Sequence, residues 1–326
     1  MSTINLSTVH VDAILTNIST AYMQEQKNFI ADKVFLPLGV KKRSDLYFRY
    51  SKDDFNTDAM TVRGDGAESA GTSYALSQDA YVTTVYALHQ DLGDQLMENA
   101  DAPLDPKRDA TMFLTQKALI RKDVQLANDA FATGIWGTDV VGVPGTPTTG
   151  QVVQWNDFTS SDPIGDIENA RDTVLQTTGQ EGNVFVMGYK VFKILKQHPD
   201  IIDRIKYTTS DVPTEALLAK LFGFDEVIVA KAVYNQAGEG QTGVFNYITG
   251  NTALVLHRPQ SAGVMVPTAG YQFHWEGVSN GIGDQIGIKS WYNQDRAATR
   301  VEAQIAFTNK IVGADLGYFF SSIVAA

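Results

Sequence analysis

A mostly polar stretch of about thirty residues lies between two strand-like runs and limits what this chain can fold into. The runs, "SDLYFRY" and "YVTTVYALHQ", are rich in aromatic and β-branched residues, which favour strands. The stretch between them, "SKDDFNTDAMTVRGDGAESAGTSYALSQDA", has few large apolar side chains. Two strands with such a long polar connection predict a projecting hairpin. Because the hairpin has no core of its own, we expect it to gain order from a partner surface.

Composition excludes several classes of protein. The chain has 326 residues, enough for one large domain or two ordinary ones, and a formal net charge of −11, which argues against broad contact with phosphate backbones. The absence of cysteine excludes disulfides, thiolate metal sites and cysteine nucleophiles. The N-terminus lacks the pattern of a signal peptide, and no apolar run approaches the roughly 18 residues that span a bilayer. We therefore expect a protein made in the cytoplasm, without membrane contact.

Two helices carry clear start and stop signals. Asp105 and Pro106 predict the beginning of a long helix over residues 106–133, followed by Gly134 as a C-cap. Asp162, Pro163 and Gly179 mark a second helix in the same way. Apolar residues recur at helical spacing within the long helix: Phe113, Ile120, Val124, Ala127 and Phe131.

Helices and strands alternate between residues 162 and 257, whereas the last third of the chain is mostly extended. This order predicts an inserted α/β unit, with a second unit built from both flanks. Within the inserted unit, a strand over residues 184–187 is followed at once by Gly188. Strand, glycine and helix also open nucleotide-binding folds, so an α/β enzyme with a nucleotide site is one alternative.

The residues that could indicate a catalytic, cofactor or metal site all have simpler structural explanations. Gly188 stands alone, without the spacing G-x-G-x-x-G that brings backbone amides to a pyrophosphate, and is most simply a turn. None of the five histidines lies within four residues of another, so no local metal pair exists. We expect no catalytic residue, no cofactor and no metal, and hence no enzyme.

The order of parts resembles the major capsid proteins of tailed bacteriophages, with the Hong Kong 97-type fold, over essentially the whole chain. The segments that carry the resemblance are "FIADKVFLPLGVKKRSDLYFRYSKDDF", "ALHQDLGDQLMENADAPLDP" and "WNDFTSSDPIGDIENARDTVLQTTGQEGNVFVMGYKVFKILKQHPDIIDRIKY", together with "ADLGYFFSSIV". The resemblance implies an α+β fold with these parts: an N-terminal arm (1–43), an extended loop hairpin (44–90), a peripheral domain with a long spine helix (91–161), an inserted axial α/β domain (162–257) and peripheral return strands (258–326).

The same resemblance implies a structural role without catalysis. Copies of the chain would form hexamers and pentamers of an icosahedral head, which encloses double-stranded DNA without sequence-specific contact. No long leader precedes the arm, so we expect a separate scaffolding protein, and also a portal. The protein would be made in the cytoplasm of a host bacterium and end in the virion capsid. The alternative within this fold is an encapsulin, the shell protein of a bacterial nanocompartment.

Candidate contacts between subunits follow from the arm, the loop and the axial surface. They are Tyr22, Phe29 and Phe35 in the arm, Lys52, Arg63, Asp65 and Glu68 in the loop, and Asp203 and Arg204 in the axial segment "KQHPDIIDRIKY".

Overall fold

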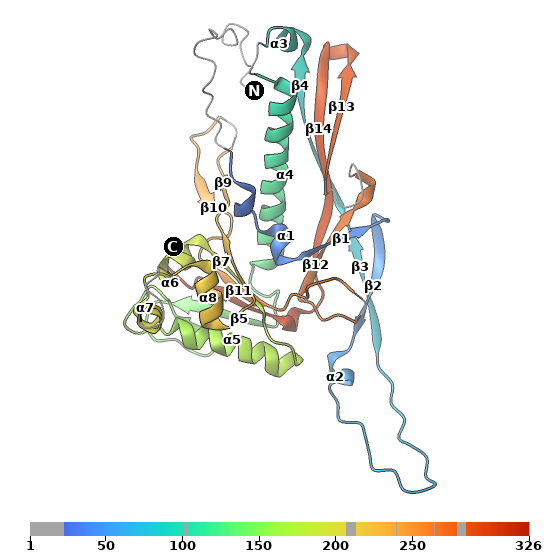
Figure 1. The fold of residues 1–326 in the computed structure, drawn as a ribbon, viewed down its shortest axis with the longest axis vertical. Helices are drawn as coiled ribbons and strands as arrows, with labels where there is room; N and C mark the ends of the chain where they lie inside the picture. Colours follow the sequence, from blue (N-terminus) through green and yellow to red (C-terminus); the bar gives the residue numbers. More distant parts are fainter. Residues whose placement is uncertain are drawn as a thin grey trace.

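The computed structural model describes residues 23–100, 104–206, 213–238, 240–263, 265–278 and 285–325. This part of the chain forms an elongated body with two main sheets, a long helix and a loop that extends well beyond the rest (Figure 1). The combination of helices with two separate mixed sheets confirms the predicted α+β class.

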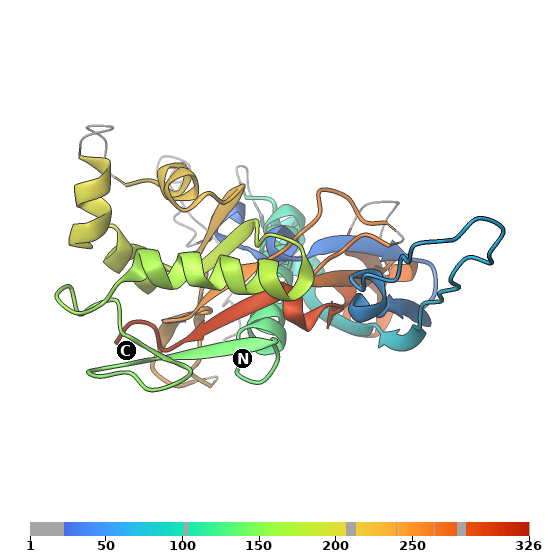
Figure 2. The ribbon, with the colours of Figure 1, turned by 90° about the horizontal axis from the view of Figure 1, so that it is seen from below.

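A six-stranded sheet forms the wider end of the molecule. Its order is β6-β5-β15-β11-β7-β8. The strands are β5 (Thr138–Val143), β6 (Gln151–Val153), β7 (Val184–Gly188), β8 (Glu226–Ala230), β11 (Ala253–Leu256) and β15 (Gly317–Ser321). The helices that accompany it are α5 (Pro163–Thr178), α6 (Tyr189–Leu195), α7 (Pro199–Ile205) and α8 (Glu215–Phe222), which lie together in Figure 2.

Strand β7 shows how this sheet is packed on both faces. Phe185 and Met187 belong to the apolar core beneath α5–α8. Val184 and Val186 belong to a second core on the opposite face, formed with α1 (Ala31–Val34) and the end of the long helix. A strand covered on both faces needs apolar residues at every position, which explains its continuous apolar sequence.

The second main sheet is long and narrow and runs beside the long helix (Figure 1). Its order is β1-β12-β14-β13, and β4 pairs with the other edge of β14. The strands are β1 (Leu36–Val40), β4 (Thr84–Gly93), β12 (Gly270–Trp275), β13 (Ile286–Asn293) and β14 (Ala298–Ile311). The remaining short elements are η2 (Gln26–Asn28), α2 (Lys52–Phe55), α3 (Asp94–Glu98), β9 (Val233–Asn235), β10 (Phe245–Tyr247), η3 (Glu276–Val278), η4 (Gln294–Arg296) and η5 (Ala314–Leu316).

The long helix α4 (Pro106–Ala130) begins where the sequence predicts, since the Asp105 side chain accepts hydrogen bonds from the amides of Lys107 and Arg108. It ends three residues earlier than predicted. The indole N–H of Trp136 donates to the Ala130 carbonyl at 2.7 Å and so satisfies one of the last free carbonyls of the helix.

The face of α4 that packs on the long sheet differs from the expected one. The buried apolar positions against the long sheet are Ala110, Leu114 and Ala118, whereas Leu126 and Ala130 belong to the core shared with α1 and the six-stranded sheet. Phe113, from the predicted stripe, is 50% exposed, and Ile120 and Val124 are only partly buried. The helix carries two apolar stripes, and the smaller residues fit against the sheet.

The predicted hairpin is present as a two-stranded ribbon, β2 (Ser44–Tyr50) paired with β3 (Leu76–Val82). The strand expected over 81–90 is divided at Thr83, which is fully buried and whose amide and hydroxyl both bond the Arg43 carbonyl. Beyond this break, β4 leaves the ribbon and joins the long sheet. The ribbon is therefore continuous with the long sheet at one end and carries the polar loop at the other.

The boundaries expected for the axial and peripheral parts do not coincide with the sheets. Strands β5 and β6, and strand β15 near residue 320, lie in the same sheet as β7, β8 and β11. Residues expected in the peripheral part thus complete the sheet of the axial part. Pairing between strands so distant in sequence leaves no local signal, which is why composition and periodicity did not reveal it.

Gly188 serves the packing of the six-stranded sheet. It ends β7 with an extended backbone, and a Cβ at this position would lie 2.1 Å from the carbonyl oxygen of Gly250 and 2.7 Å from that of Thr249. Such close approach of two backbones admits only glycine. The glycine that suggested a nucleotide loop is explained by this contact.

We expect Gly188→Ala to destabilise the subunit by about 2–3 kcal/mol, because the methyl group must displace backbone rather than a flexible side chain. Urea unfolding followed by circular dichroism would measure the loss. Gly250→Ala is the matched control, since a Cβ there meets no atom within 4 Å. Equal midpoints for the two variants would contradict the packing role of Gly188.

Candidate assembly surfaces

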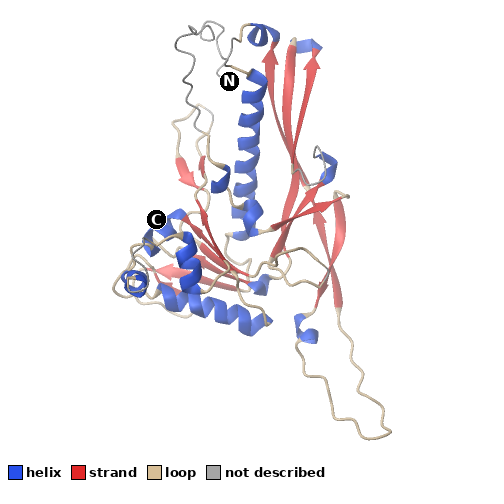
Figure 3. Cartoon of the chain, in the orientation of Figure 1, coloured by secondary structure: helices blue, strands red, loops and turns tan. Residues whose placement is uncertain are grey.

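The projecting loop, residues 51–75, leaves the body where β2 and β3 end (Figures 1 and 3). Its side chains are exposed almost throughout, and Met60 is 94% exposed. The loop contains five acidic and two basic residues, a formal charge of −3. A segment this exposed, with apolar residues at its far end, is typical of a surface that a partner covers.

The base of the loop is held by aromatic rings. Tyr50, Phe55 and Tyr74 form a cluster with ring centroids 5.6 to 6.0 Å apart. The Asp54 carboxylate accepts a 2.7 Å hydrogen bond from the Ala75 amide. These contacts join the two ends of the loop, so its direction is set by the subunit itself.

The four loop residues expected to contact a neighbour divide into two groups. Lys52 pairs within its own subunit, 2.6 Å from Asp315, and fastens the loop base to the body. Arg63, Asp65 and Glu68 are exposed and form no ion pair within the part of the chain that the structure describes. Their contact with a neighbouring subunit stays a prediction.

The β2–β3 ribbon has one exposed apolar face. Leu46 lies opposite Ala80, Phe48 opposite Gln78 and Tyr50 opposite Leu76, and directly opposed residues share a face. On this face Leu46 is 57% and Phe48 55% exposed. The other face is packed, since Tyr47 and Tyr81 lie against Phe273. Leu76, 48% exposed, and Val82, 57% exposed, lie on the same face as Leu46 and Phe48, so four exposed large apolar side chains form a second candidate surface.

The arm is docked to α4 by two adjacent charged residues that sequence reasoning missed. Both carboxylate oxygens of Asp123 accept from the backbone amides of Ile30 and Ala31 at 2.8 to 3.1 Å. The Lys122 ammonium binds Asp32 and Gln285. Both side chains are 2% exposed, and burial raises the pKa of Asp123 to about 6 and lowers that of Lys122. In the sequence they are two of several charged residues on α4, so no local signal marks them.

Docking of the arm corrects two expected contacts between subunits. Phe35 has no exposed surface and Phe29 only 7%, and Phe35 packs in the core that also contains Trp136. Aromatic residues in a polar arm suggested an interface, but their partner is the subunit's own core. Tyr22 lies outside the described residues.

Asp203 and Arg204 lie on α7 and are exposed, as an interface would require. Each already has a partner in its own subunit: Asp203 is 2.7 Å from Lys206, and Arg204 is 3.8 Å from Glu168. Exposed ion pairs contribute little free energy, so these pairs do not exclude contact with a neighbouring subunit. That contact stays a prediction.

Asp91 binds two arginine side chains at the far end of the long sheet. Asp91 on β4 lies opposite Arg300 on β14 and binds it through two hydrogen bonds of 2.6 and 2.8 Å. Arg296 adds a third at 2.9 Å. The bond to Arg300, more than any other contact, holds the pKa of Asp91 at about 2, below its ordinary value of 3.8.

Asp91→Asn should therefore weaken the subunit by about 1 kcal/mol at neutral pH, a value kept small because the pair lies near the surface. A lowered pKa stabilises the fold above the unfolded value of 3.8 and loses that effect as the pH falls towards 2. Urea midpoints of wild type and variant should converge over that range. Asp45→Asn, which removes an exposed pair with Lys42, should change little at any pH. A constant difference would contradict the ionic origin.

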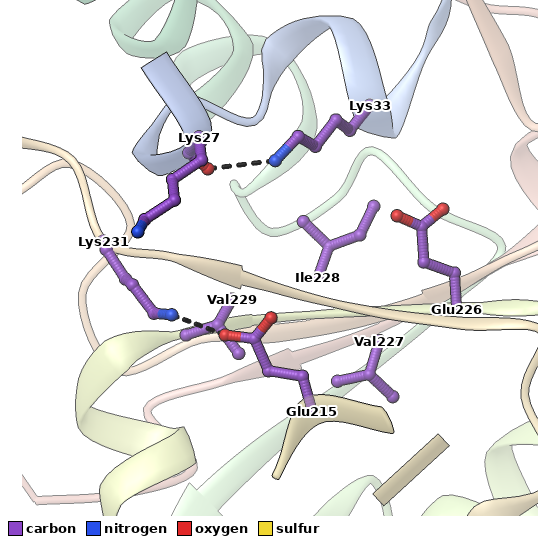
Figure 4. Close-up of a pocket in the computed structure, with 8 residues that line it drawn as sticks. All are labelled: Lys27, Lys33, Glu215, Glu226, Val227, Ile228, Val229 and Lys231. Carbon is purple, nitrogen blue, oxygen red and sulfur yellow. Dashed lines mark hydrogen bonds and ion pairs between the residues drawn. The ribbon is translucent and has the colours of Figure 1, made fainter. Parts of the chain in front are cut away.

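A small polar pocket separates the arm from the edge strand β8 (Figure 4). Its volume is about 120 Å³, and its lining consists of Lys27, Lys33, Glu215, Glu226, Val227, Ile228, Val229 and Lys231. Lys231 pairs with Glu215 at 2.5 Å, and the Lys33 ammonium donates to the Lys27 carbonyl at 2.9 Å. Ligand sites usually measure roughly 300 to 1,000 Å³, so this pocket is a junction between elements rather than a nucleotide site.

Ser161, His198 and Asp200 come together in an arrangement reminiscent of a hydrolase. Ser161 Oγ is 3.1 Å from His198 Nε2, and His198 Nδ1 is 3.5 Å from Asp200. The histidine has no exposed surface, burial lowers its pKa, and the serine hydroxyl donates to the Asp157 carbonyl at 2.6 Å. Without access for a substrate, the contact joins the start of α5 to that of α7.

Within the described ranges, no group of three or more His, Asp or Glu side chains could hold a metal ion. A search of the same residues finds no helix that is long and apolar enough to cross a bilayer. The features that indicate function are therefore surfaces for contact with a partner: the acidic loop and the apolar face of the ribbon, beside an arm that is docked on α4.

Comparison with known proteins agrees with this picture. A family model described as phage major capsid protein E matches residues 148–306. The chain is 26% identical over 322 residues to a major capsid protein of Pseudomonas phage JBD67, covering 97% of this chain and 98% of the relative. The capsid structure of cyanophage P-SCSP1u has a TM-score of 0.64 at 10% identity, over 97% of this chain and 93% of that one.

An encapsulin complex from Synechococcus elongatus PCC 7942 is also similar, with a TM-score of 0.55 at 12% identity over 94% of this chain and 92% of that one. Identities this low show a shared fold alone. The sequence relative, in contrast, is a phage protein aligned over nearly its whole length. The family match, the sequence relatives and the shared fold together support a structural phage capsid protein with the Hong Kong 97-type fold.

Proposed function

We propose that copies of this chain assemble into hexamers and pentamers that tile an icosahedral phage head. The observation that supports the proposal is the projecting loop, which has no core of its own and exposes Met60 almost completely. The apolar ribbon face beside it adds to the surface that a single subunit leaves uncovered. Neighbouring copies would bury both, as stable interfaces require.

The proposal includes partners other than the chain itself. A separate scaffolding protein would guide assembly, a portal would occupy one vertex, and double-stranded DNA would fill the head without sequence-specific contact. The formal charge of −11 supports weak attraction for DNA, which lets a genome move during filling. Synthesis would take place in the host cytoplasm, the product would reside in the virion capsid, and the role would involve no catalysis.

Electron microscopy of the expressed protein, alone and together with its scaffold, tests this function. We expect capsomers or closed shells. A protein that stays strictly monomeric at high concentration, even with scaffold, would contradict the proposal.

The genes that neighbour this one would distinguish a phage head from an encapsulin. Portal and terminase genes beside this one support a phage head, whereas a gene for a ferritin-like protein or a peroxidase supports a nanocompartment. The whole-length phage relative already favours the head.

A further inference from the structure

A histidine is buried between α4 and the long sheet without a hydrogen-bond partner. His274 lies on β12 and is 7% exposed, and neither of its ring nitrogens bonds to a residue that the structure describes. Gln272, two residues away on the same face of β12, has no exposed surface, and its Oε1 also lacks a partner there. This face is turned towards α4, since Gln272 donates to Asn309, which donates to Asp129 on the helix. Buried polar groups without partners are uncommon in folded proteins and call for a reason.

Charged groups surround His274. Lys122 on α4 is 2% exposed and binds Asp32 on α1, and Asp123 beside it accepts from the arm. Glu276 follows His274 in η3. Burial and the Lys122 charge lower the pKa of His274, against the opposing effect of Glu276 and Asp32. The ring is therefore neutral at neutral pH, and an added proton would place a second positive charge near Lys122.

Strand β1 closes over this histidine. His274 lies opposite Gly39 of β1 on one side and opposite Phe307 of β14 on the other, and neither neighbour carries a charge. A Cβ at Gly39 would lie 3.3 Å from His274 Nε2 and 2.5 Å from Glu276 Oε1, so the backbone of β1 passes directly over both side chains. Because β1 is an edge strand of the sheet that the structure describes, it can separate from β12 without breaking another pair of strands.

We propose that His274 acts as a proton switch for the attachment of β1. At neutral pH the uncharged ring allows β1 to close over it. On acidification a ring nitrogen takes up a proton, and β1 separates from β12 while the rest of the subunit stays folded. Since β1 runs from α1 of the arm to β2 of the ribbon, its release changes how both are joined to the long sheet (Figure 1). The inference concerns the single subunit and goes beyond the proposed assembly.

Acid should weaken the closure of β1. The ring has its ordinary pKa of 6.5 when β1 is open and a lower pKa when β1 is closed, so the open state binds more protons. Closure is therefore most stable above pH 6.5 and loses stability as the pH falls below that value. Asp123 acts in the opposite sense, because its raised pKa of about 6 strengthens the docked arm as the carboxylate becomes protonated. A comparison of variants, rather than of pH values alone, isolates the histidine.

Hydrogen exchange of the subunit, followed by mass spectrometry, tests the switch. After correction for the intrinsic pH dependence of exchange, peptides that cover β1 should exchange about tenfold faster at about pH 5.5 than at about pH 7.5, because an open ring with a pKa of 6.5 gains that factor in proton binding. His274→Gln, which takes up no proton in this range, should abolish the acceleration. His89→Gln, at an exposed position on β4 of the same sheet, is the matched control and should retain it. An unchanged acceleration in the His274→Gln subunit would overturn the proposal.

Titration of the wild-type histidines by NMR supplies a measurement that does not depend on the folding of a variant. The chain has five histidines, so each imidazole signal can be followed separately. His274 should stay neutral as long as the β1 peptides are protected, and it should become protonated only as their exchange accelerates. A His274 signal that titrates near 6.5 while β1 stays protected refutes the switch, because the closed site would then tolerate the charge.

Discussion

A chain in which residues 56–73 are replaced by a short Gly-Ser connection should fold but form no shells. The replaced residues make no core contact, because they are exposed throughout, so the free energy of unfolding should hardly change. Assembly should fall by about a hundredfold or more, since each subunit loses the segment that we propose to contact its neighbour. Sedimentation and electron microscopy would measure particles, and thermal unfolding the stability of the subunit.

Two features make the loop variant interpretable. The replacement leaves Tyr50, Phe55 and Tyr74 in place, so the base of the loop keeps its aromatic cluster. Gly71→Ala, at a site where a Cβ meets no atom within 4 Å, is a control within the same loop and should assemble normally. Shells of normal size and yield from the shortened chain would show that the loop is dispensable.

Asp123→Ala should destabilise the docked arm by about 3 kcal/mol. The change leaves the amides of Ile30 and Ala31 buried without an acceptor, and each unsatisfied donor costs roughly 1–3 kcal/mol. It also removes the carboxylate that compensates the neighbouring Lys122 charge. Hydrogen exchange at residues 30 and 31 should accelerate by about a hundredfold, and proteolysis should cut the arm first.

Asp123→Asn is the matched control for this change. One oxygen of Asp123 already accepts from both amides, so an amide oxygen in that position can retain them. Burial raises the pKa of Asp123 from its ordinary value of 3.8 to about 6. The free energy of unfolding of the wild type relative to Asp123→Asn is therefore largest below pH 3.8, and this difference is lost as the pH rises through 6. Wild type and Asp123→Asn should therefore diverge between those values; equal loss of arm protection in the Ala and Asn variants at pH 7 would contradict the acceptor role.

The elements that the sequence predicted well are those specified by neighbouring residues. Helix α5 begins after Asp162, whose side chain accepts from the Gly165 amide, and ends at Gly179 in a left-handed conformation. Cap residues act over a single turn, so the sequence states them directly. The ribbon followed from strand-forming residues on both sides of a polar segment, and whole-chain patterns indicated the fold.

The elements that the sequence did not predict depend on contacts distant along the chain. Phe113 and Leu114 are adjacent apolar residues on α4, and only the shape of the sheet decides that Leu114 is buried. Asp123 and Lys122 are ordinary charged residues until the arm folds over them. Phe35 was expected at an interface between subunits for the same reason: the sequence shows that it must be covered but not by which surface.

The position of β15 has a consequence for the time at which the subunit becomes ready to assemble. Residues 317–321 form an interior strand of the six-stranded sheet, between β5 and β11, although they are made after every other strand of the described chain. Before these residues have emerged, no strand joins β5 and β6 to β11, β7 and β8, and the core between them is incomplete. Domains complete themselves only when their last essential segment has emerged. A growing chain therefore lacks a finished six-stranded sheet until residues 317–321 have emerged, and the surface of this sheet is complete only after that point.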